Sequence, residues 1–276
     1  MRFLAWMARL IPARAVGFLL GWLAFSVLRV RRRVVLKNLE QALGLRGAEA
    51  RRLAADLYRH LGAGAVELLR APGNTPAQAK ELLGPEGMRR LDTVMAQGRG
   101  VLVLTAHLGH WDLLACAAAQ AGLPLSVVTR RIKAGWLDRF WSGLRETCGV
   151  KLLPDSGSAG RIISRLRRGE MVGYVLDQHQ PGGLAVPFFG RPAATSDSLA
   201  RLARATGSPV VAAYLIRQPG GGFRLEVSDP LPAIQDLEGN KGERIHEATR
   251  IYAETLEQAI RRWPEQWLWL HRRWKI

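Results

Sequence analysis

His107 and Asp112 are the residues of this chain best suited to proton transfer, and they follow directly on the apolar run 101–105. A histidine held by a carboxylate can act as a general base, because the carboxylate keeps one ring nitrogen protonated while the other accepts a proton. Residues five positions apart on a helix point about 140° away from each other, so the pair can meet only if the chain turns at Gly109. The spacing predicts a catalytic dyad. The alternative is a packed loop histidine beside a first-turn helix carboxylate.

The same segment also suits a metal ion, since His107, His110 and Asp112 supply nitrogen and oxygen ligands and three ligands suffice for catalytic zinc. The remaining histidines are scattered. The two cysteines, Cys116 and Cys148, lack the paired spacing of a structural zinc site and cannot form a disulfide framework. We therefore expect no metal and a reducing compartment.

Asp177 and Gln178 form a second polar cluster after the apolar run 171–176. In open sheets of parallel strands, ligands bind at the carboxyl ends of the strands. We therefore expect Asp177 and Gln178 to share one crevice with His107. A helix cap or a loop carboxylate is the alternative for Asp177 alone.

Two arginines lie near these clusters in the sequence. Arg130 follows the strand predicted over 125–129, and Arg145 lies in the next predicted helix. Guanidinium groups suit bidentate contacts to phosphate, so both are candidates for substrate binding. A solvated helix face is the alternative for each.

The segment 186–192 reads Val-Pro-Phe-Phe-Gly-Arg-Pro and is predicted to be an apolar loop. Phe188 and Phe189 fit the wall of a slot for an alkyl chain. They fit ordinary core packing equally well.

Apolar runs of strand length alternate with helical patterns along most of the chain, which predicts a mostly parallel central sheet flanked by helices. Strands are expected over 101–105, 125–129, 150–153, 171–176 and 209–216, with an edge strand over 223–227. Helices are expected over 111–121, 135–148, 159–167, 196–205 and 242–262. A helical lead-in, residues 31–98, with helices over 33–43, 48–69 and 85–97, precedes the α/β core, residues 99–276.

The N-terminal segment combines the most apolar run of the chain, residues 15–28, with arginines at both ends. As a helix this run reaches roughly 21 Å, less than the roughly 30 Å of a hydrocarbon core. An arginine cluster rather than a cleavage site follows it, which argues against a signal peptide. We expect residues 1–30 to form a short or interfacial membrane anchor with the rest of the chain facing the cytoplasm. A buried core helix is the alternative.

The net charge points to an acidic partner, since 40 Lys and Arg face 23 Asp and Glu and give +17. Nucleic acid, anionic lipid and a phosphorylated substrate all fit such a charge. The strongest basic cluster adjoins the apolar N-terminal helix, and no nucleic-acid-binding module is recognisable. We therefore expect a membrane and an anionic substrate rather than nucleic acid.

Taken together, these residues resemble the late acyltransferases of lipid A biosynthesis, the lauroyl/myristoyl acyltransferase family within the larger glycerolipid acyltransferase group. The matching motifs occur in order along nearly the whole chain, and the C-terminal blocks are the most distinctive. They are Arg32–Leu39, His107-Leu-Gly-His-Trp-Asp112, Arg145 with Gly149, Asp177-Gln178, Val186-Pro-Phe-Phe-Gly190 with Thr195, and Pro264-Glu-Gln-Trp-Leu-Trp-Leu-His-Arg-Arg-Trp274.

The resemblance implies that His107 is the general base on an acceptor hydroxyl and that Asp112 orients and charge-balances it. The hydroxyl would attack the thioester of an acyl carrier protein, or of coenzyme A. Site roles for Arg145 and Asp177 are implied as well. A base and donors for the developing oxyanion suffice for this chemistry, so we expect no cofactor and no catalytic Ser or Cys.

The acceptor implied by the resemblance is an anionic glycolipid such as a lipid A precursor, at the cytoplasmic face of the bacterial inner membrane. Many relatives have Asn where this chain has His110, and often Glu where it has Asp112. Related enzymes with a similar His-x4-Asp motif acylate mannosylated phosphatidylinositol, which is the alternative acceptor.

A lipid hydrolase and a nucleic-acid-binding protein are the competing classes of function. The chain has no Gly-x-Ser-x-Gly nucleophile elbow, which argues against the common serine hydrolases. The tryptophans and arginines of the C-terminal tail, residues 261–274, fit either an interfacial belt against lipid headgroups or a packed terminal segment covering the sheet.

Overall fold

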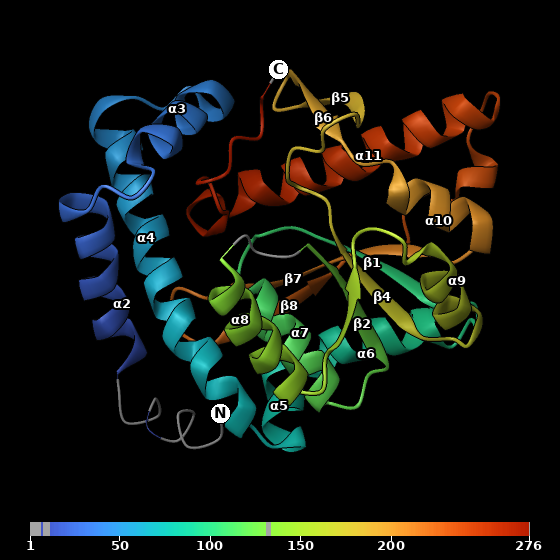
Figure 1. Cartoon of the computed structure of the whole chain (residues 1–276), viewed down its shortest axis with the longest axis horizontal. Coiled ribbons are helices and arrows are strands. Elements are labelled where there is room, and N and C mark those ends of the chain that lie inside the picture. The colour runs from blue at the N-terminus through green and yellow to red at the C-terminus, as the bar shows by residue number, and fades with distance from the viewer. Residues whose placement is uncertain (1–6, 8–11, 131–133, 276) are drawn as a thin grey trace.

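A computed structural model describes residues 7, 12–130 and 134–275 and confirms the α/β fold with a mostly parallel sheet (Figure 1). The strand order is β3-β2-β4-β1-β7-β8, and the pairing of β7 with β8 is antiparallel. The strands of this sheet are β1 (Val101–Thr105), β2 (Leu125–Thr129), β3 (Lys151–Pro154), β4 (Met171–Val175), β7 (Val210–Arg217) and β8 (Phe223–Val227). The predicted edge strand is therefore confirmed as β8.

Helices cover both faces of the sheet, and side chains of β1 point alternately to the two faces. Val101 and Val103 pack with α5 (Pro76–Leu83), α6 (Pro85–Met95), α7 (Trp111–Gln120) and the end of α8 (Gly135–Thr147). Leu102 and Leu104 belong to the other core, with α9 (Ala159–Arg167), α10 (Ser198–Thr206) and α11 (Lys241–Arg262). Burial on both faces explains why β1 is a continuous apolar run.

Two elements differ from those expected from the sequence. The predicted loop 186–192 is a hairpin of β5 (Leu184–Phe188) and β6 (Arg191–Thr195), and its two turn residues, Phe189 and Gly190, both have positive φ, 54° and 68°. Such a two-residue turn matches the twist of the strands. Helix α5 was not expected. Its signal was the capping box of Thr75 with Gln78 around Pro76.

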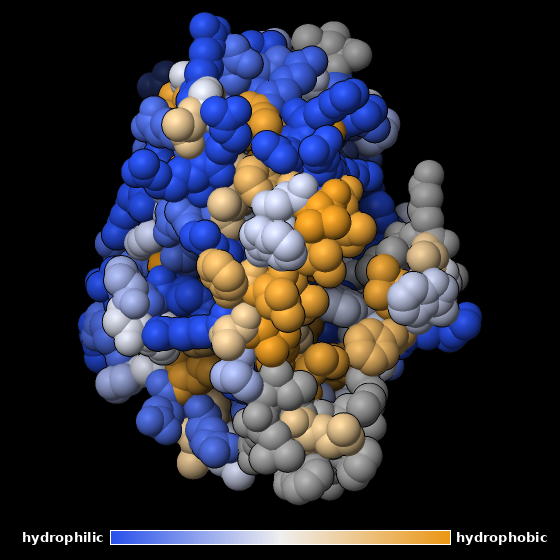
Figure 2. All heavy atoms as spheres, turned by 90° about the vertical axis from the view of Figure 1, so that its left-hand side faces the viewer, coloured by the Kyte–Doolittle hydropathy of each residue, from blue (hydrophilic) through white to orange (hydrophobic). Residues whose placement is uncertain are grey.

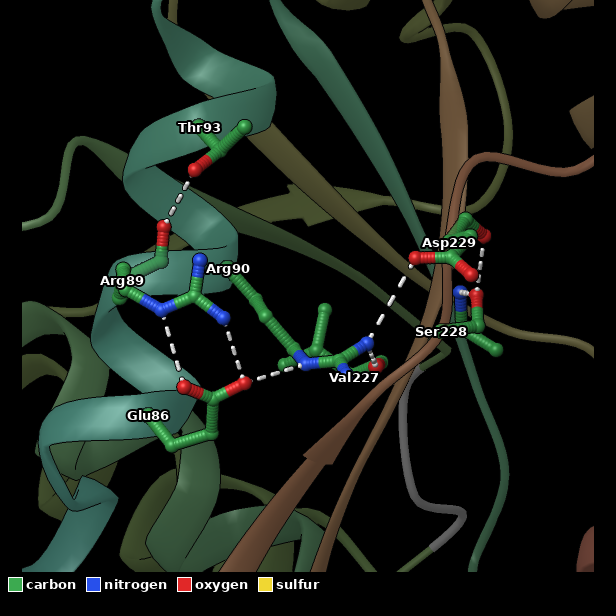
Figure 3. Close-up of polar contacts among 8 residues, drawn as sticks. Glu86, Arg89, Arg90, Thr93, Val227, Ser228 and Asp229 are labelled. Atoms are coloured by element: carbon green, nitrogen blue, oxygen red, sulfur yellow. Dashed lines mark hydrogen bonds and ion pairs between the residues drawn. The ribbon is translucent and has the colours of Figure 1, made fainter.

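Helix α6 packs against the edge strand β8, and polar contacts join the two elements (Figure 3). Arg90 donates to the Val227 carbonyl at 3.2 Å, and its Nη1 lies 3.6 Å from the Asp229 carboxylate. Glu86 binds both Arg89 and Arg90. These contacts attach α6 to the C-terminal end of β8.

The N-terminal region is helical, and part of its apolar surface faces outward. Helix α2 (Ala13–Trp22) continues as a π-helix over Leu23–Val27 and is followed by α3 (Arg32–Leu43). Of the predicted anchor, residues 1–6 and 8–11 lie outside the described part of the chain. No single described helix has the length and hydropathy of a membrane span, but Ala13–Val27 and Arg32–Leu43 meet the criterion as a pair bent by 91°.

Close backbone contact holds α2 against α4 (Gly47–Arg70), the long helix beside it in Figure 1. A Cβ at Gly17 would lie 2.5 Å from the backbone nitrogen of Ala63, so glycine is required for this approach. The opposite side of α2 and the segment after it are exposed and apolar, and Figure 2 shows hydrophobic atoms gathered on this side of the molecule. We call these residues the apolar N-terminal face: Phe18, Leu19, Leu20, Trp22, Leu23, Val27, Leu28 and Val30.

Helix α4 also holds the turn that follows β1. His60 donates to the Gly109 carbonyl (3.0 Å) and accepts from the Nε of Arg217 (3.3 Å). Arg217 also forms a bidentate ion pair with Glu67. Gly109 has φ 62°, and a Cβ there would lie 2.2 Å from the Leu215 carbonyl oxygen, so the turn presses closely on β7.

His110 caps helix α7. Its Nδ1 accepts from the backbone N–H of Leu113 (3.3 Å), and its Nε2 donates to the Gly64 carbonyl (3.1 Å). Asparagine is also a preferred residue at an N-cap position. Both nitrogens are satisfied only in the neutral ring. Burial, together with the nearby Arg217, lowers the pKa of both His110 and His60 to about 4.

The low pKa of His110 predicts acid-dependent stability. Because the unfolded ring titrates near 6.5, the stabilisation is complete above about pH 6.5 and is lost as the pH falls toward 4. His110→Asn keeps an N-cap acceptor and removes the titration, so its free energy of unfolding should decline less steeply between pH 6.5 and 4.5, by about 2 kcal/mol over the window. Urea denaturation at several pH values measures this. Equal slopes for the variant and the parent protein would contradict it, and the exposed His246→Asn is the control.

Candidate active site

His107 and Asp177 meet at the carboxyl ends of the paired strands β1 and β4. Thr105 and Val175 are partners in the register, and both functional residues follow two positions later. Nδ1 of His107 lies 2.9 Å from Oδ1 of Asp177, and the backbone N–H of His107 donates to Oδ2 of Asp177, also at 2.9 Å. The predicted convergence of the two strand ends is therefore confirmed.

Asp112 occupies a different position from the one expected in the sequence analysis. It lies in the first turn of α7, where Oδ1 accepts from Nε and Nη2 of Arg145 (2.8 and 2.6 Å) and Oδ2 accepts from the indole of Trp141 (2.9 Å). The ring hydrogen bond that the five-residue spacing assigned to Asp112 is made by Asp177. The helix turns Asp112 toward α8, whereas Nδ1 of His107 faces the end of β4.

The electrostatics of the pair follow from burial and from its hydrogen bonds. Burial alone would raise the pKa of Asp177, but His107 and the hydrogen bonds to the carboxylate lower it to about 2. Asp177 is therefore ionised at neutral pH, and Nδ1 of His107 is the donor of their hydrogen bond. Burial is the largest single effect on His107 and lowers its pKa, but the charge of Asp177, its hydrogen bond to the ring and the charge of Asp112 together raise the pKa above its ordinary value. In the neutral ring Nε2 then carries the free lone pair.

His107 lines a pocket of about 600 Å³ that opens at this edge of the sheet. One wall, here called the apolar wall, faces α7 and consists of Val103, Leu114, Ala115, Leu125, Val127, Gly173 and Val175. The polar wall consists of Arg130, Asp155, Ser156, His179, Gln180, Ser196 and Ser198. A ligand with a hydrocarbon part and a polar part fits such a pocket.

Gln178 lines the pocket with His107, as expected, whereas Asp177 is buried behind the His107 ring and is not among the lining residues. Arg145 lines the pocket as well. Nε2 of Gln178 lies 3.4 and 3.5 Å from the two ring nitrogens of His107. Arg130 is present as well, but its guanidinium binds Asp155 (2.8 Å) and Gln180 (2.7 Å) across the polar wall. Its charge is therefore partly compensated by Asp155.

Phe188 and Phe189 are placed in the core and do not belong to the pocket lining. They pack against Trp267 and Trp274 at centroid distances between 5.9 and 6.3 Å. The slot for an alkyl chain that the sequence suggested is therefore not formed by these rings, and core packing, the other possibility, describes them. The hairpin turn points both side chains inward.

Three aromatic residues of the site were missed by sequence reasoning. Trp111 packs edge-on against the His107 ring (5.1 Å between centroids), while Trp141 and Trp267 donate indole N–H groups to Asp112 and Asp177. Trp111 is part of the motif His107-Leu-Gly-His-Trp-Asp112, but that motif gave no sign of a contact between Trp111 and the His107 ring. For Trp141 and Trp267 the sequence carried no signal of a partner, because the contacts are long-range.

The metal alternative finds no support in the geometry. Both ring nitrogens of His110 are engaged away from His107, with Leu113 and Gly64. Within the described residues, no group of three or more His, Cys, Asp or Glu side chains could hold a metal ion.

Proteins with similar sequences are acyltransferases. A sequence profile of the family described as bacterial lipid A biosynthesis acyltransferase matches residues 2–276. The chain is 29% identical over 274 residues to the lipid A biosynthesis lauroyltransferase of Escherichia coli, and 26% identical over 267 residues to its palmitoleoyltransferase, covering 94% of this chain and 84% of each relative. It is also 26% identical over 194 residues to a phosphatidylinositol mannoside acyltransferase of Mycobacterium tuberculosis, covering 68% of this chain and 58% of that one.

The profile match spans nearly the whole chain, and the paired strand ends place a hydrogen-bonded histidine and aspartate beside the pocket. This protein therefore belongs to the bacterial lipid A biosynthesis acyltransferase family.

Proposed function

We propose that this acyltransferase moves a fatty acyl chain from the thioester of an acyl carrier protein to a hydroxyl of an anionic glycolipid, such as a lipid A precursor, with His107 as general base. The observation that carries the proposal is the hydrogen bond between Nδ1 of His107 and the ionised Asp177, which leaves Nε2 as an acceptor on a residue that lines the pocket. Acyl-coenzyme A is the alternative donor.

In this scheme Nε2 of His107 takes the proton of the acceptor hydroxyl as its oxygen attacks the thioester carbonyl. The tetrahedral intermediate collapses, the carbon–sulfur bond breaks, and the protonated imidazole returns its proton to the departing thiolate. Asp177 stabilises the positively charged ring between the two proton transfers. Neither a nucleophilic side chain nor a cofactor is needed.

We assign to Arg145 the stabilisation of the negative charge that develops on the thioester carbonyl oxygen. Its guanidinium lines the pocket, and Asp112 and Trp141 hold it in place. Asp112 raises the pKa of His107, and Arg145 lowers it. Because the two charges oppose each other there, we assign to Asp112 the task of orienting Arg145 rather than the ring.

The apolar wall suits the acyl chain of the donor. Val103, Gly173 and Val127 are partners across β1, β4 and β2, so one row of the wall has a glycine between two valines. The names of the relatives, a lauroyltransferase and a palmitoleoyltransferase, attribute acyl chains of different length to the family. Because the glycine leaves room in this row, we propose that Gly173 helps determine the length of the acyl chain that the pocket accepts.

The apolar N-terminal face, flanked by Arg29, Arg31 and Arg33, supports association with the cytoplasmic face of the bacterial inner membrane. Eight large apolar side chains there are more than one-third exposed. A contiguous apolar surface next to cations suits insertion into an anionic interface.

The reaction is tested with purified enzyme, an acyl carrier protein thioester and either a lipid A precursor or a phosphatidylinositol mannoside, with products identified by mass spectrometry. We expect acylation of the lipid A precursor, and loss of at least ~10³-fold in His107→Asn and Asp177→Asn, because the base or its tautomer is lost. Asp112→Asn should cost less, about 10- to 100-fold. The acid limb of the pH profile should move to lower pH in Asp177→Asn, since Asp177 raises the pKa of His107.

Full activity of His107→Asn would refute the assigned base. If only the phosphatidylinositol mannoside is acylated, that lipid rather than a lipid A precursor is the acceptor. Fatty acid release that is independent of any acceptor would indicate a hydrolase. A larger loss in Asp112→Asn than in Asp177→Asn would reverse the roles of the two carboxylates.

Gly173→Val should shorten the acyl chain that the enzyme accepts. A Cβ at Gly173 would lie 3.6 Å from Cγ2 of Val127, an ordinary contact, so the strand accommodates the added Cβ, and a larger side chain takes its volume from the pocket. In competition between dodecanoyl and hexadecanoyl donors, the variant should favour the shorter chain by about 10-fold more than the parent protein does. Gly173→Ala should fall between the two. An unchanged ratio would exclude this wall as the acyl site.

Leu19→Glu combined with Leu28→Glu should reduce co-flotation with anionic vesicles several-fold, because each apolar side chain that would insert into the lipid is replaced by a negative charge that anionic lipid repels. Both positions are more than half exposed, so the fold should persist. Thr93→Glu with Gln235→Glu adds the same charge elsewhere on the surface and serves as the control. Equal vesicle binding by the two double variants would argue against this face.

A further inference from the structure

The C-terminal tail, residues 264–274, lies directly beside the catalytic turn. The backbone N–H of Gly109 donates to the Gln266 carbonyl (3.0 Å), and that of Leu268 donates to the His107 carbonyl (2.9 Å). Between them, Leu108 and Trp267 form an antiparallel bridge. The tail thus acts as a short strand that holds the backbone on both sides of Leu108.

The side chain of Trp267 continues from this bridge to the carboxylate of Asp177. Its indole Nε1 donates to Oδ2 at 2.7 Å, and Trp267 is only 1% exposed. The ring stacks on Phe189 (6.3 Å) and meets Trp269 edge-on (4.5 Å). A buried indole N–H needs an acceptor, and the neighbouring Trp269 uses the backbone carbonyl of Pro264 instead (2.7 Å).

Asp177 is the group most affected by this contact. Oδ2 accepts from the indole and from the backbone N–H of His107, and Oδ1 faces the His107 ring. Two donors on one oxygen fix the plane of the carboxylate, so the other oxygen is directed at Nδ1. They also disperse the negative charge that acts on the imidazole.

We propose that Trp267 is a positioning residue of the acyl transfer reaction, which acts on His107 through Asp177. The inference rests on the proposed role of His107 as the base. In this role the indole N–H of Trp267 does more than pack in the core. It sets the orientation of the Asp177 carboxylate and the strength of the interaction between that carboxylate and the His107 ring.

Other charged and titratable groups also face the pair. They are Asp112 on α7, Arg145 on α8, Tyr214 on β7, and His271 and Arg273 on the tail, with His179 acting on His271. None of these groups is changed by a substitution at Trp267, so a change in the titration of His107 reports the loss of the indole donor.

Trp267→Phe removes the N–H and keeps most of the aromatic packing. With a donor lost, the charge on Asp177 is less dispersed and the pKa of His107 rises, so the acid limb of kcat/KM should move up by about half a pH unit. We expect kcat to fall about 10-fold, with KM for the acyl donor unchanged within about two-fold. Trp269→Phe is the matched control, because it removes an equally buried indole donor that binds a carbonyl, and its acid limb should stay in place.

An acid limb that is the same in Trp267→Phe and the parent protein would overturn the proposal. So would an equal shift in Trp269→Phe, because packing alone would then explain it. NMR titration of the His107 ring in the full chain separates this result from the proposed function. A raised pKa in Trp267→Phe supports the positioning role even if His107→Asn proves active, whereas an unchanged pKa overturns it.

The unsubstituted protein supplies a second measurement if Trp267→Phe fails to fold. The indole Hε1 resonance of Trp267 should shift with pH in step with the titration of His107, while that of Trp269 should stay constant. A Trp267 resonance that does not follow this titration would overturn the proposal.

Discussion

The ionised carboxylate of Asp177, only 2% exposed, is the constraint on which the site depends. A buried charge is costly unless hydrogen bonds and an opposite charge compensate it. The donors that satisfy Asp177 come from two distant parts of the chain: the ring and backbone of His107, and the indole of Trp267. Forming the site therefore requires β1, β4 and the C-terminal tail to be in place together.

The two carboxylates near the pocket, Asp177 and Asp112, have different partners, so each affects a different side chain of the site. Asp177 pairs with His107 and raises its pKa, whereas Asp112 forms an ion pair with Arg145 and fixes the position of that guanidinium at the pocket. A single carboxylate between both partners could not raise the basicity of the ring and orient the guanidinium equally well. The fold avoids this conflict by placing the two acids on different elements, at the end of β4 and in the first turn of α7.

Helix α4 connects the outer surface to the catalytic turn. One side of the helix receives α2 through the close contact of Gly17 with Ala63. Another side, within the same turns, holds the loop after β1 through His60 and through the carbonyl of Gly64. The exposed apolar face of α2 is therefore attached to the site by one helix, which gives the apolar N-terminal face and His107 a defined relative position.

The sequence alone determined the elements and most of the members of the site. Hydrophobic periodicity and length located β1, β2 and β8 at their observed bounds, and polar residues directly after buried strands identified His107 and Asp177, because local pattern and strand-end position are properties of short segments. Which carboxylate binds the ring was decided only by tertiary structure, since Asp112 is near in sequence but turned away by its helix, and Asp177 is brought close by the pairing of β1 with β4. The same holds for Phe188, buried by a hairpin turn, and for Trp267, whose partner lies 90 residues away. Such contacts depend on the register and direction of whole elements, which no local pattern encodes.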